Sequence, residues 1–119
     1  MNIKLYKENL KNEVIEPMLD YLMEDGEDCG FAKRDVKKCE DIILKYLAAL
    51  ERIKRPNDKK IMKEVKKVVI SLNKLNKRTG YSIIETMERE AIWEIIQTSA
   101  VECGLTDPAD DITEKWREW

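Results

Sequence analysis

Histidine is absent from this chain, and glycine, proline and cysteine are scarce: its 119 residues include four glycines, three prolines and three cysteines. Histidine is the side chain whose ordinary pKa lies near neutrality, so its absence excludes histidine-dependent catalytic triads and metal sites with histidine ligands. Cys29, Cys39 and Cys103 form no CxxC motif, and an odd number of cysteines cannot all pair within one chain. We therefore expect a reducing, cytoplasmic setting, and neither a metal nor another cofactor.

Long apolar runs are also missing. Charged residues, among them Lys7, Glu8, Lys11 and Glu13, interrupt the first segment, so the sequence predicts neither a secretion signal nor a transmembrane helix. Charged residues make up 39% of the chain, while the 43% of hydrophobic residues is close to the value of an ordinary globular protein. The length suits one domain, which we expect to span residues 1–119.

Apolar residues recur every three or four positions in four segments, and this spacing predicts amphipathic helices. The segments are residues 7–24, 32–54, 58–77 and a fourth that ends at Cys103. Pro17 lies inside the first segment, where it predicts either a kink, which we favour, or the first turn of a separate helix. The second and third helices should bury Val36, Cys39, Ile43, Tyr46, Leu50, Ile53, Ile61, Val65, Val68, Leu72 and Leu75.

Cap residues mark the ends of these helices. Asn57 can accept hydrogen bonds from the first free amides of the third helix, and Gly104 can end the fourth in a left-handed conformation. The fourth helix begins either at Ser82, which has the spacing of a capping box, or at Thr86. It should bury Met87, Ala91, Ile92, Ile95, Ile96, Ser99 and Cys103.

The last residues predict one more helical turn, because Ile112, Trp116 and Trp119 would share one side of it. No segment alternates between apolar and polar residues as a strand does. The sequence therefore predicts an all-α fold: an antiparallel bundle of four main helices with a short C-terminal helical turn.

Residues 25–30 invite comparison with a calcium-binding loop because they are acidic and end in glycine. The comparison fails at the fifth position, which is Cys29, and at the twelfth, where Val36 replaces the bidentate glutamate. An ordinary solvated loop, with Cys29 as an exposed thiol, is the simpler interpretation, whereas Cys39 and Cys103 lie on apolar stripes and read as core residues.

Carboxylates are plentiful on the fourth helix, but no apolar pocket that would raise the pKa of one of them is evident. Neither common phosphate-binding glycine loop occurs in the chain. We therefore expect that the protein is not an enzyme.

Charge is strongly segregated along the chain. Residues 52–78 contain eleven Lys or Arg and two acids, whereas residues 79–119 contain three basic and ten acidic residues. A lysine-rich helix face can neutralise phosphates, which makes a nucleic-acid-associated protein the alternative function. Packing against the acidic parts of the same chain explains the lysines equally well, and no aromatic residue between 47 and 80 is available to stack on bases. The candidate phosphate-binding residues are Lys59, Lys63, Lys66, Lys67 and Lys74.

The C-terminal segment combines acids with two tryptophans, and it has two interpretations. The indoles can anchor an interface whose surrounding acids suit a basic partner. Alternatively, the tail folds back and caps the bundle through the same indoles. The candidate partner-binding residues are Asp107, Asp110, Asp111, Glu114, Trp116 and Trp119, together with Glu90 and Glu94 of the fourth helix.

Residues 111–119 (DITEKWREW), together with 84–90 (IETMERE) and 103–105 (CGL), resemble small α-helical bacterial proteins, some of which are similar to immunity proteins of polymorphic or contact-dependent toxin systems. The resemblance covers about the last third of the chain. It implies a cytoplasmic domain that binds a toxin domain and blocks its active site or its access to substrate. A non-catalytic protein-binding domain is thus the expected function, and a homodimeric structural or regulatory protein is a further alternative.

Overall fold

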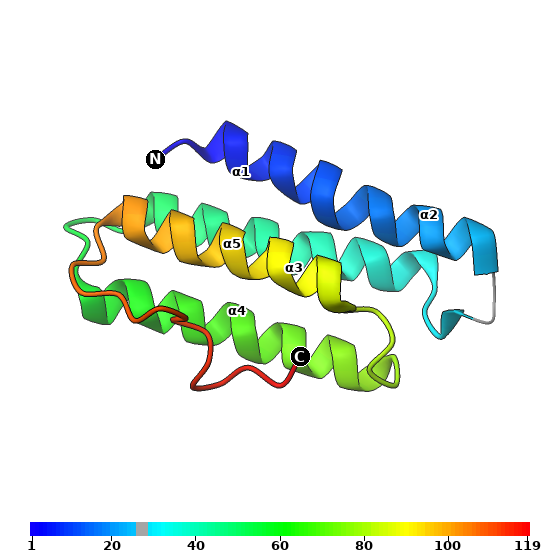
Figure 1. The fold of residues 1–119 in the computed structure, drawn as a ribbon. Coiled ribbons are helices and arrows are strands. Elements are labelled where there is room, and N and C mark those ends of the chain that lie inside the picture. The colour runs from blue at the N-terminus through cyan, green and yellow to red at the C-terminus, as the bar shows by residue number, and fades with distance from the viewer. Residues whose placement is uncertain (26–28) are drawn as a thin grey trace.

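The computed structural model describes residues 1–25 and 29–119, and within these every regular element is helical. The elements are α1 (Ile3–Leu10), the π-helix η1 (Lys11–Ile15), α2 (Glu16–Asp25), α3 (Lys33–Arg52), α4 (Asp58–Arg78) and α5 (Thr86–Cys103). Because α1, η1 and α2 follow one another without a break, they form the first of four main helices, and the predicted all-α bundle is confirmed (Figure 1). None of the described helices is both long and apolar enough to cross a membrane.

The first helix continues without a break through Pro17, the second residue of α2. Proline has no amide hydrogen, and its ring crowds the carbonyl group four residues earlier. The backbone just before it forms a π-helix, in which the Glu16 amide bonds to the Lys11 carbonyl five residues back. The irregularity of this helix is therefore a wider turn before the proline, and no separate helix begins at Pro17.

The helices pack around one core. In Figure 1 the first helix and α4 lie on opposite sides of α3 and α5. The predicted stripes of α3 and α4 are buried, except that Ile53 is half-buried at the end of α3. Met87 is a correction: it is 80% exposed, because it lies in the first turn of α5, before the buried stripe begins at Ala91.

The predicted caps at Asn57 and Gly104 are confirmed, and of the two predicted starts of the fourth helix the structure has the one at Thr86. Asn57 accepts a hydrogen bond from the Lys60 amide at 2.9 Å, and Gly104 ends α5 with a φ of 126°. Helix α5 begins at Thr86, so the start at Ser82 is wrong. The hydroxyl of Ser82 instead donates to the Thr79 carbonyl at 2.6 Å, within the α4–α5 connection.

Cys29 is buried, which corrects the expectation of an exposed thiol. The chain after it turns back against the bundle, where Phe31 stacks on Tyr21 and the Cys29 thiol donates to the Phe31 carbonyl. Cys39 is buried as expected, and burial raises the pKa of its thiol to about 12. The interpretation of residues 25–30 as a solvated loop concerns mainly residues 26–28, which lie outside the described residues.

Two tyrosines hold α5 against its neighbours. The Tyr46 hydroxyl on α3 lies 3.1 Å from the Ile96 carbonyl and 2.9 Å from the Ser99 hydroxyl, and all three residues are buried. Near the end of α5, the Tyr6 hydroxyl of α1 donates to the Glu102 carboxylate. These bonds fix the position of α5, on which the C-terminal segment rests.

The substitution Tyr46→Phe tests the buried bond between α3 and α5. We expect the free energy of unfolding to fall by about 1 kcal/mol, because the Ile96 carbonyl loses one of its two side-chain donors in a buried site. Urea denaturation followed by circular dichroism measures the change. Tyr81→Phe, whose side chain is 57% exposed, is the control, and an equal effect in both variants would contradict the assignment.

Candidate protein-binding surface

The C-terminal segment returns along α4 and is held there by one buried side chain. Asn73 of α4 is 9% exposed, and both ends of its amide group are used. Its Nδ2 donates to the Trp116 carbonyl at 2.7 Å, while its Oδ1 accepts from the Glu118 amide at 2.9 Å. Figure 1 shows this segment in red, running beside α4.

A second amide fixes the beginning of the segment on α5. Gln97 donates through Nε2 to the Ala109 carbonyl at 2.9 Å and accepts through Oε1 from the Ile112 amide at 3.0 Å. At the start of α4, Asp58 accepts from both the amide and the hydroxyl of Thr106. The segment is therefore tied to α4 and α5 at three places.

The tryptophans lie against the bundle, as the second interpretation of the tail expects. Ile112 is buried, and Trp116 and Trp119 are half-buried against the core. Two ammonium groups lie near the Trp116 ring, that of Lys66 at 6.0 Å and that of Lys115 at 5.7 Å from its centroid. The indoles are thus already engaged and do not form free interface anchors.

The carboxylate of Asp111 is also engaged in contacts within the protein. Its carboxylate accepts from the amide and hydroxyl of Thr113 and pairs with the Arg117 guanidinium at 2.9 Å. Burial raises the pKa of Asp111, but the bonds from Thr113 and the charge of Arg117 outweigh it and hold that pKa below its usual value. This ion pair shapes the tail and leaves Asp111 only partly available to a partner.

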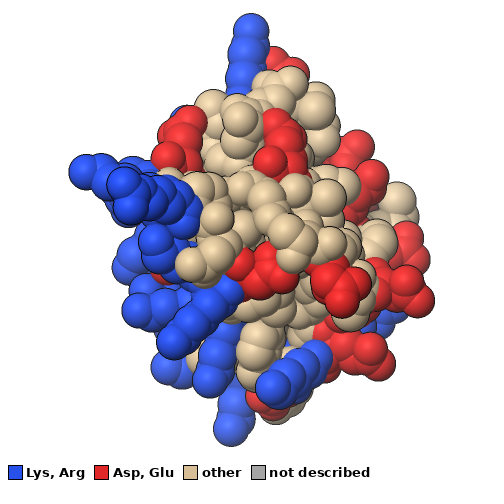
Figure 2. Space-filling view, turned by 90° about the vertical axis from the view of Figure 1, so that its left-hand side faces the viewer, with Lys and Arg blue, Asp and Glu red and all other residues tan. Residues whose placement is uncertain are grey.

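Five of the predicted acids remain exposed. Glu90 and Glu94 are one turn apart on α5, and Gln97, almost one turn further along, holds the tail that carries the other three. Figure 2 shows Asp and Glu gathered on one side of the molecule and Lys and Arg on the other. We call these five residues the acidic surface: Glu90, Glu94, Asp107, Asp110 and Glu114.

The five lysines of the alternative interpretation are in different situations. Lys66 lies over the Trp116 ring, and Lys67 pairs with Glu64 at 3.1 Å. Lys59, Lys63 and Lys74 are exposed. All five lysines are exposed; the charges of two are partly compensated within the chain, and the other three make no such contact among the described residues.

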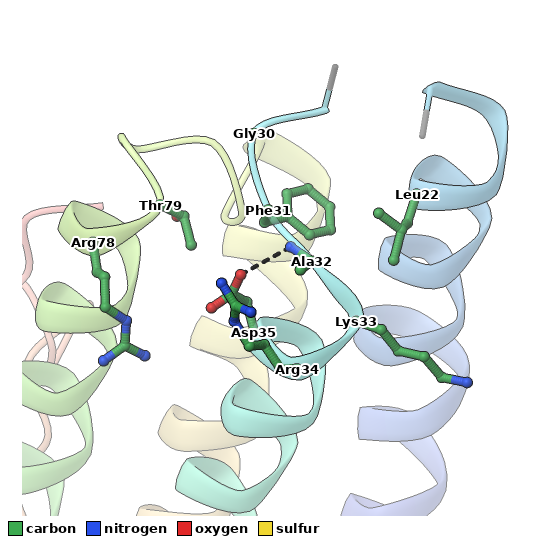
Figure 3. Close-up of a pocket in the computed structure, with 9 residues that line it drawn as sticks. All are labelled: Leu22, Gly30, Phe31, Ala32, Lys33, Arg34, Asp35, Arg78 and Thr79. Atoms are coloured by element: carbon green, nitrogen blue, oxygen red, sulfur yellow. Dashed lines mark hydrogen bonds between the residues drawn. The ribbon is translucent and has the colours of Figure 1, made fainter. Parts of the chain in front are cut away.

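A cavity of about 640 Å³ lies at the beginning of α3, and no sequence pattern predicted it. Asp35 caps the helix there by accepting from the Ala32 amide at 2.8 Å. Figure 3 shows that Arg78 lines the cavity from α4, whereas the side chain of Lys33 points away from the cavity toward α2. The basic side chains do not converge on one point, so the cavity lacks a focused anion site.

Metal ligation finds no support in residues 1–25 and 29–119, where no group of three Cys, Asp or Glu side chains is arranged to hold an ion. No protein family matches the sequence, and neither does any curated protein or solved structure. The resemblance to immunity proteins therefore stays a prediction.

Replacing Asn73 with alanine should release the tail. The Trp116 carbonyl and the Glu118 amide would lose their buried partner, so we expect the free energy of unfolding to fall by about 1–3 kcal/mol. Limited trypsin digestion should then cleave faster after Lys115 and Arg117. Asn12→Ala, at an exposed position of η1, is the control, and unchanged cleavage in Asn73→Ala would show that other contacts hold the tail.

The Asp111 ion pair predicts a pH dependence. A carboxyl group whose pKa is lower in the folded state stabilises the protein above its unfolded pKa of about 3.9, and this stabilisation is lost as the pH falls through the folded value. Asp111→Asn should therefore be less stable than the parent near neutral pH, and the difference should shrink in acid. Urea denaturation across this pH range, with the exposed Asp110→Asn as control, measures it; a pH-independent difference would contradict the role of the charge.

Proposed function

We propose that this chain is a non-catalytic protein-binding domain whose acidic surface binds a basic partner, and that it serves as an immunity protein that neutralises a toxin domain. The observation that carries the proposal is the attachment of the tail to α5. Through Gln97, the backbone on both sides of Asp110 is fixed on α5, the helix that carries Glu90 and Glu94. A prearranged surface loses little conformational entropy when it binds.

The charges of this surface suit recognition better than catalysis. Glu90 and Glu94 are exposed, so neither lies in the apolar pocket that a general acid catalyst needs. Exposed carboxylates of one sign speed up association with a basic surface and disfavour acidic competitors. The partner implied by this chemistry is a protein with a basic surface, and a toxin that acts on nucleic acid is one class that carries such a surface.

The resemblance to immunity proteins supports the same region. Of the three segments that carry the resemblance, residues 84–90 include Glu90 and residues 111–119 include Glu114. The pair Asp111 and Arg117, which shapes the tail, also lies in the last segment. The residues that suggest the family and those that form the acidic surface therefore adjoin each other.

A charge reversal on α5 tests the proposal. The proteins encoded by neighbouring genes are co-expressed with the chain, and the complex that survives nuclease treatment is measured by calorimetry. We expect Glu90→Lys with Glu94→Lys to raise the dissociation constant at least about tenfold, because two attractive contacts become repulsive. The same variant should protect cells less well against the toxic neighbour.

The matched control is Asp20→Lys with Glu24→Lys, which reverses two exposed acids at the same spacing on α2. It should leave both affinity and protection unchanged. If both double variants weaken the complex equally, the effect is one of net charge, and the acidic surface is not the binding site. If retention disappears with nuclease and follows Lys59, Lys63 and Lys74, the nucleic-acid alternative replaces the proposal.

A further inference from the structure

An open groove of about 510 Å³ runs between α3 and α4. Its apolar lining includes Ile42 and Ala49 of α3 and Val68 of α4, and the small side chains of Ala49 and Ser71 leave room between the helices. The tail occupies the other side of α4, between that helix and α5, so it does not cover this groove. The tail thus covers the groove between α4 and α5, whereas the groove between α3 and α4 is open.

Basic side chains flank the groove. Lys45 and Arg52 lie on α3 and Lys66 and Lys67 on α4, and all four are exposed. Glu64 is the acid among the residues that line the groove, and it pairs with Lys67. The groove is lined by four basic residues and one acid. It therefore combines an apolar floor with a positive rim.

The tail shows which kind of segment suits α4. Residues 107–119 contain five acids and two basic residues, and Ile112, Trp116 and Trp119 pack against the bundle. Ile112 is buried beside α5, and Trp116 lies near the Lys66 ammonium group of α4. An acidic segment with one apolar side is thus already bound on one flank of this helix, where apolar and basic side chains stand together as they do in the groove.

The dimensions favour a helical occupant. From Ile42 to Arg52 the α3 side of the groove spans about 15 Å, or roughly three helical turns. A groove between two helices accepts the ridge of a third, and anchor residues at helical spacing fill its floor. A nucleic acid would gain little from this floor, because its aromatic residue, Tyr46, is only 4% exposed and cannot stack on bases.

We propose that the α3–α4 groove is a second binding site, and that it takes an acidic amphipathic helix from a partner protein. The apolar side of that helix would pack against the floor of the groove. Its carboxylates would form ion pairs with Lys45, Arg52 and Lys67. The site lies away from the acidic surface, so it stands independently of the function proposed above.

A designed peptide tests this site directly. The probe is a fluorescein-labelled helix of about five turns, with leucines along one side and glutamates elsewhere. An isomer of identical composition, with its leucines spread around the helix, tests whether the apolar side matters. Fluorescence anisotropy gives both affinities, a labelled oligonucleotide serves as a polyanion probe, and circular dichroism confirms that each protein variant is folded.

We expect the amphipathic peptide to bind at least about tenfold more tightly than its isomer. The triple variant Lys45→Glu, Arg52→Glu, Lys67→Glu should lose about tenfold or more in affinity. Ala49→Phe should do the same without a change of charge, because its ring fills the floor. The matched charge control, Lys59→Glu, Lys63→Glu, Lys74→Glu, and the variant Glu90→Lys, Glu94→Lys should each change the affinity by less than about threefold.

Four results would overturn the proposal. Equal binding of the two peptides, or no measurable binding of either, would remove the apolar groove from consideration. Equal losses in the two lysine variants, with tighter binding of the oligonucleotide, would assign a diffuse polyanion surface instead. A dimer in light scattering that Ala49→Phe converts to a monomer would identify a second copy of the chain as the occupant.

Discussion

The buried carboxamide of Asn73 determines where the C-terminal tail lies, and the tail completes the acidic surface. A buried amide that loses its partners costs free energy, so Asn73 favours the one tail position in which its Nδ2 and Oδ1 are both bonded. Gln97 imposes the same condition on the beginning of the tail. Apolar contact alone would not select this register, because Ile112 and Trp116 could slide along a hydrophobic groove, whereas the two amides cannot.

The segregation of charge concentrates repulsion between like charges on α4, and this repulsion is a load that destabilises the helix. Its basic residues repel one another, and Lys59 and Lys60 lie near the positive end of the helix dipole. Several contacts offset this load: Lys60 donates to the carbonyls of Lys54 and Arg55, Lys67 pairs with Glu64, and Lys66 lies over Trp116. The remaining exposed lysines have no such compensation among the described contacts. A partner that brings negative charge to this side would therefore relieve repulsion as well as add contacts.

The sequence predicted the helices well because their signals are local. The three- and four-residue spacing in α3 and α4 directly reports the buried side, and Asn57 and Gly104 end their helices through their own backbone geometry. The predictions that Cys29 is exposed and that Met87 is buried were wrong for a different reason. Their burial depends on how the chain on either side packs, through Phe31 and Tyr21 in one case and through the start of α5 in the other. Spacing within one helix contains no information about such contacts.

The candidate site was only partly accessible to sequence reasoning for the same reason. The acids and tryptophans of the tail were identified from composition, and both interpretations of the tryptophans were open. What decides between them is the pairing of Asn73 with residues more than forty positions away, and of Gln97 with Ala109 and Ile112. One sign was present in the sequence: Asn73 interrupts the apolar stripe of α4 next to Leu72, and a polar residue beside a core position must find a partner.

Helix α4 contacts the tail and also forms one wall of the groove. It carries Asn73 toward the tail and Lys67, Val68 and Ser71 toward the groove, while Lys66 both lines the groove and lies over the Trp116 ring. Because Lys66 lines the groove and also lies over the Trp116 ring, a helix bound in the groove would contact a residue that supports the tail. If one partner changes the affinity for the other through this helix, linkage requires the effect to be equal in both directions. A rigid α4 would thereby join an acidic surface and a basic groove into one domain with two separate partners.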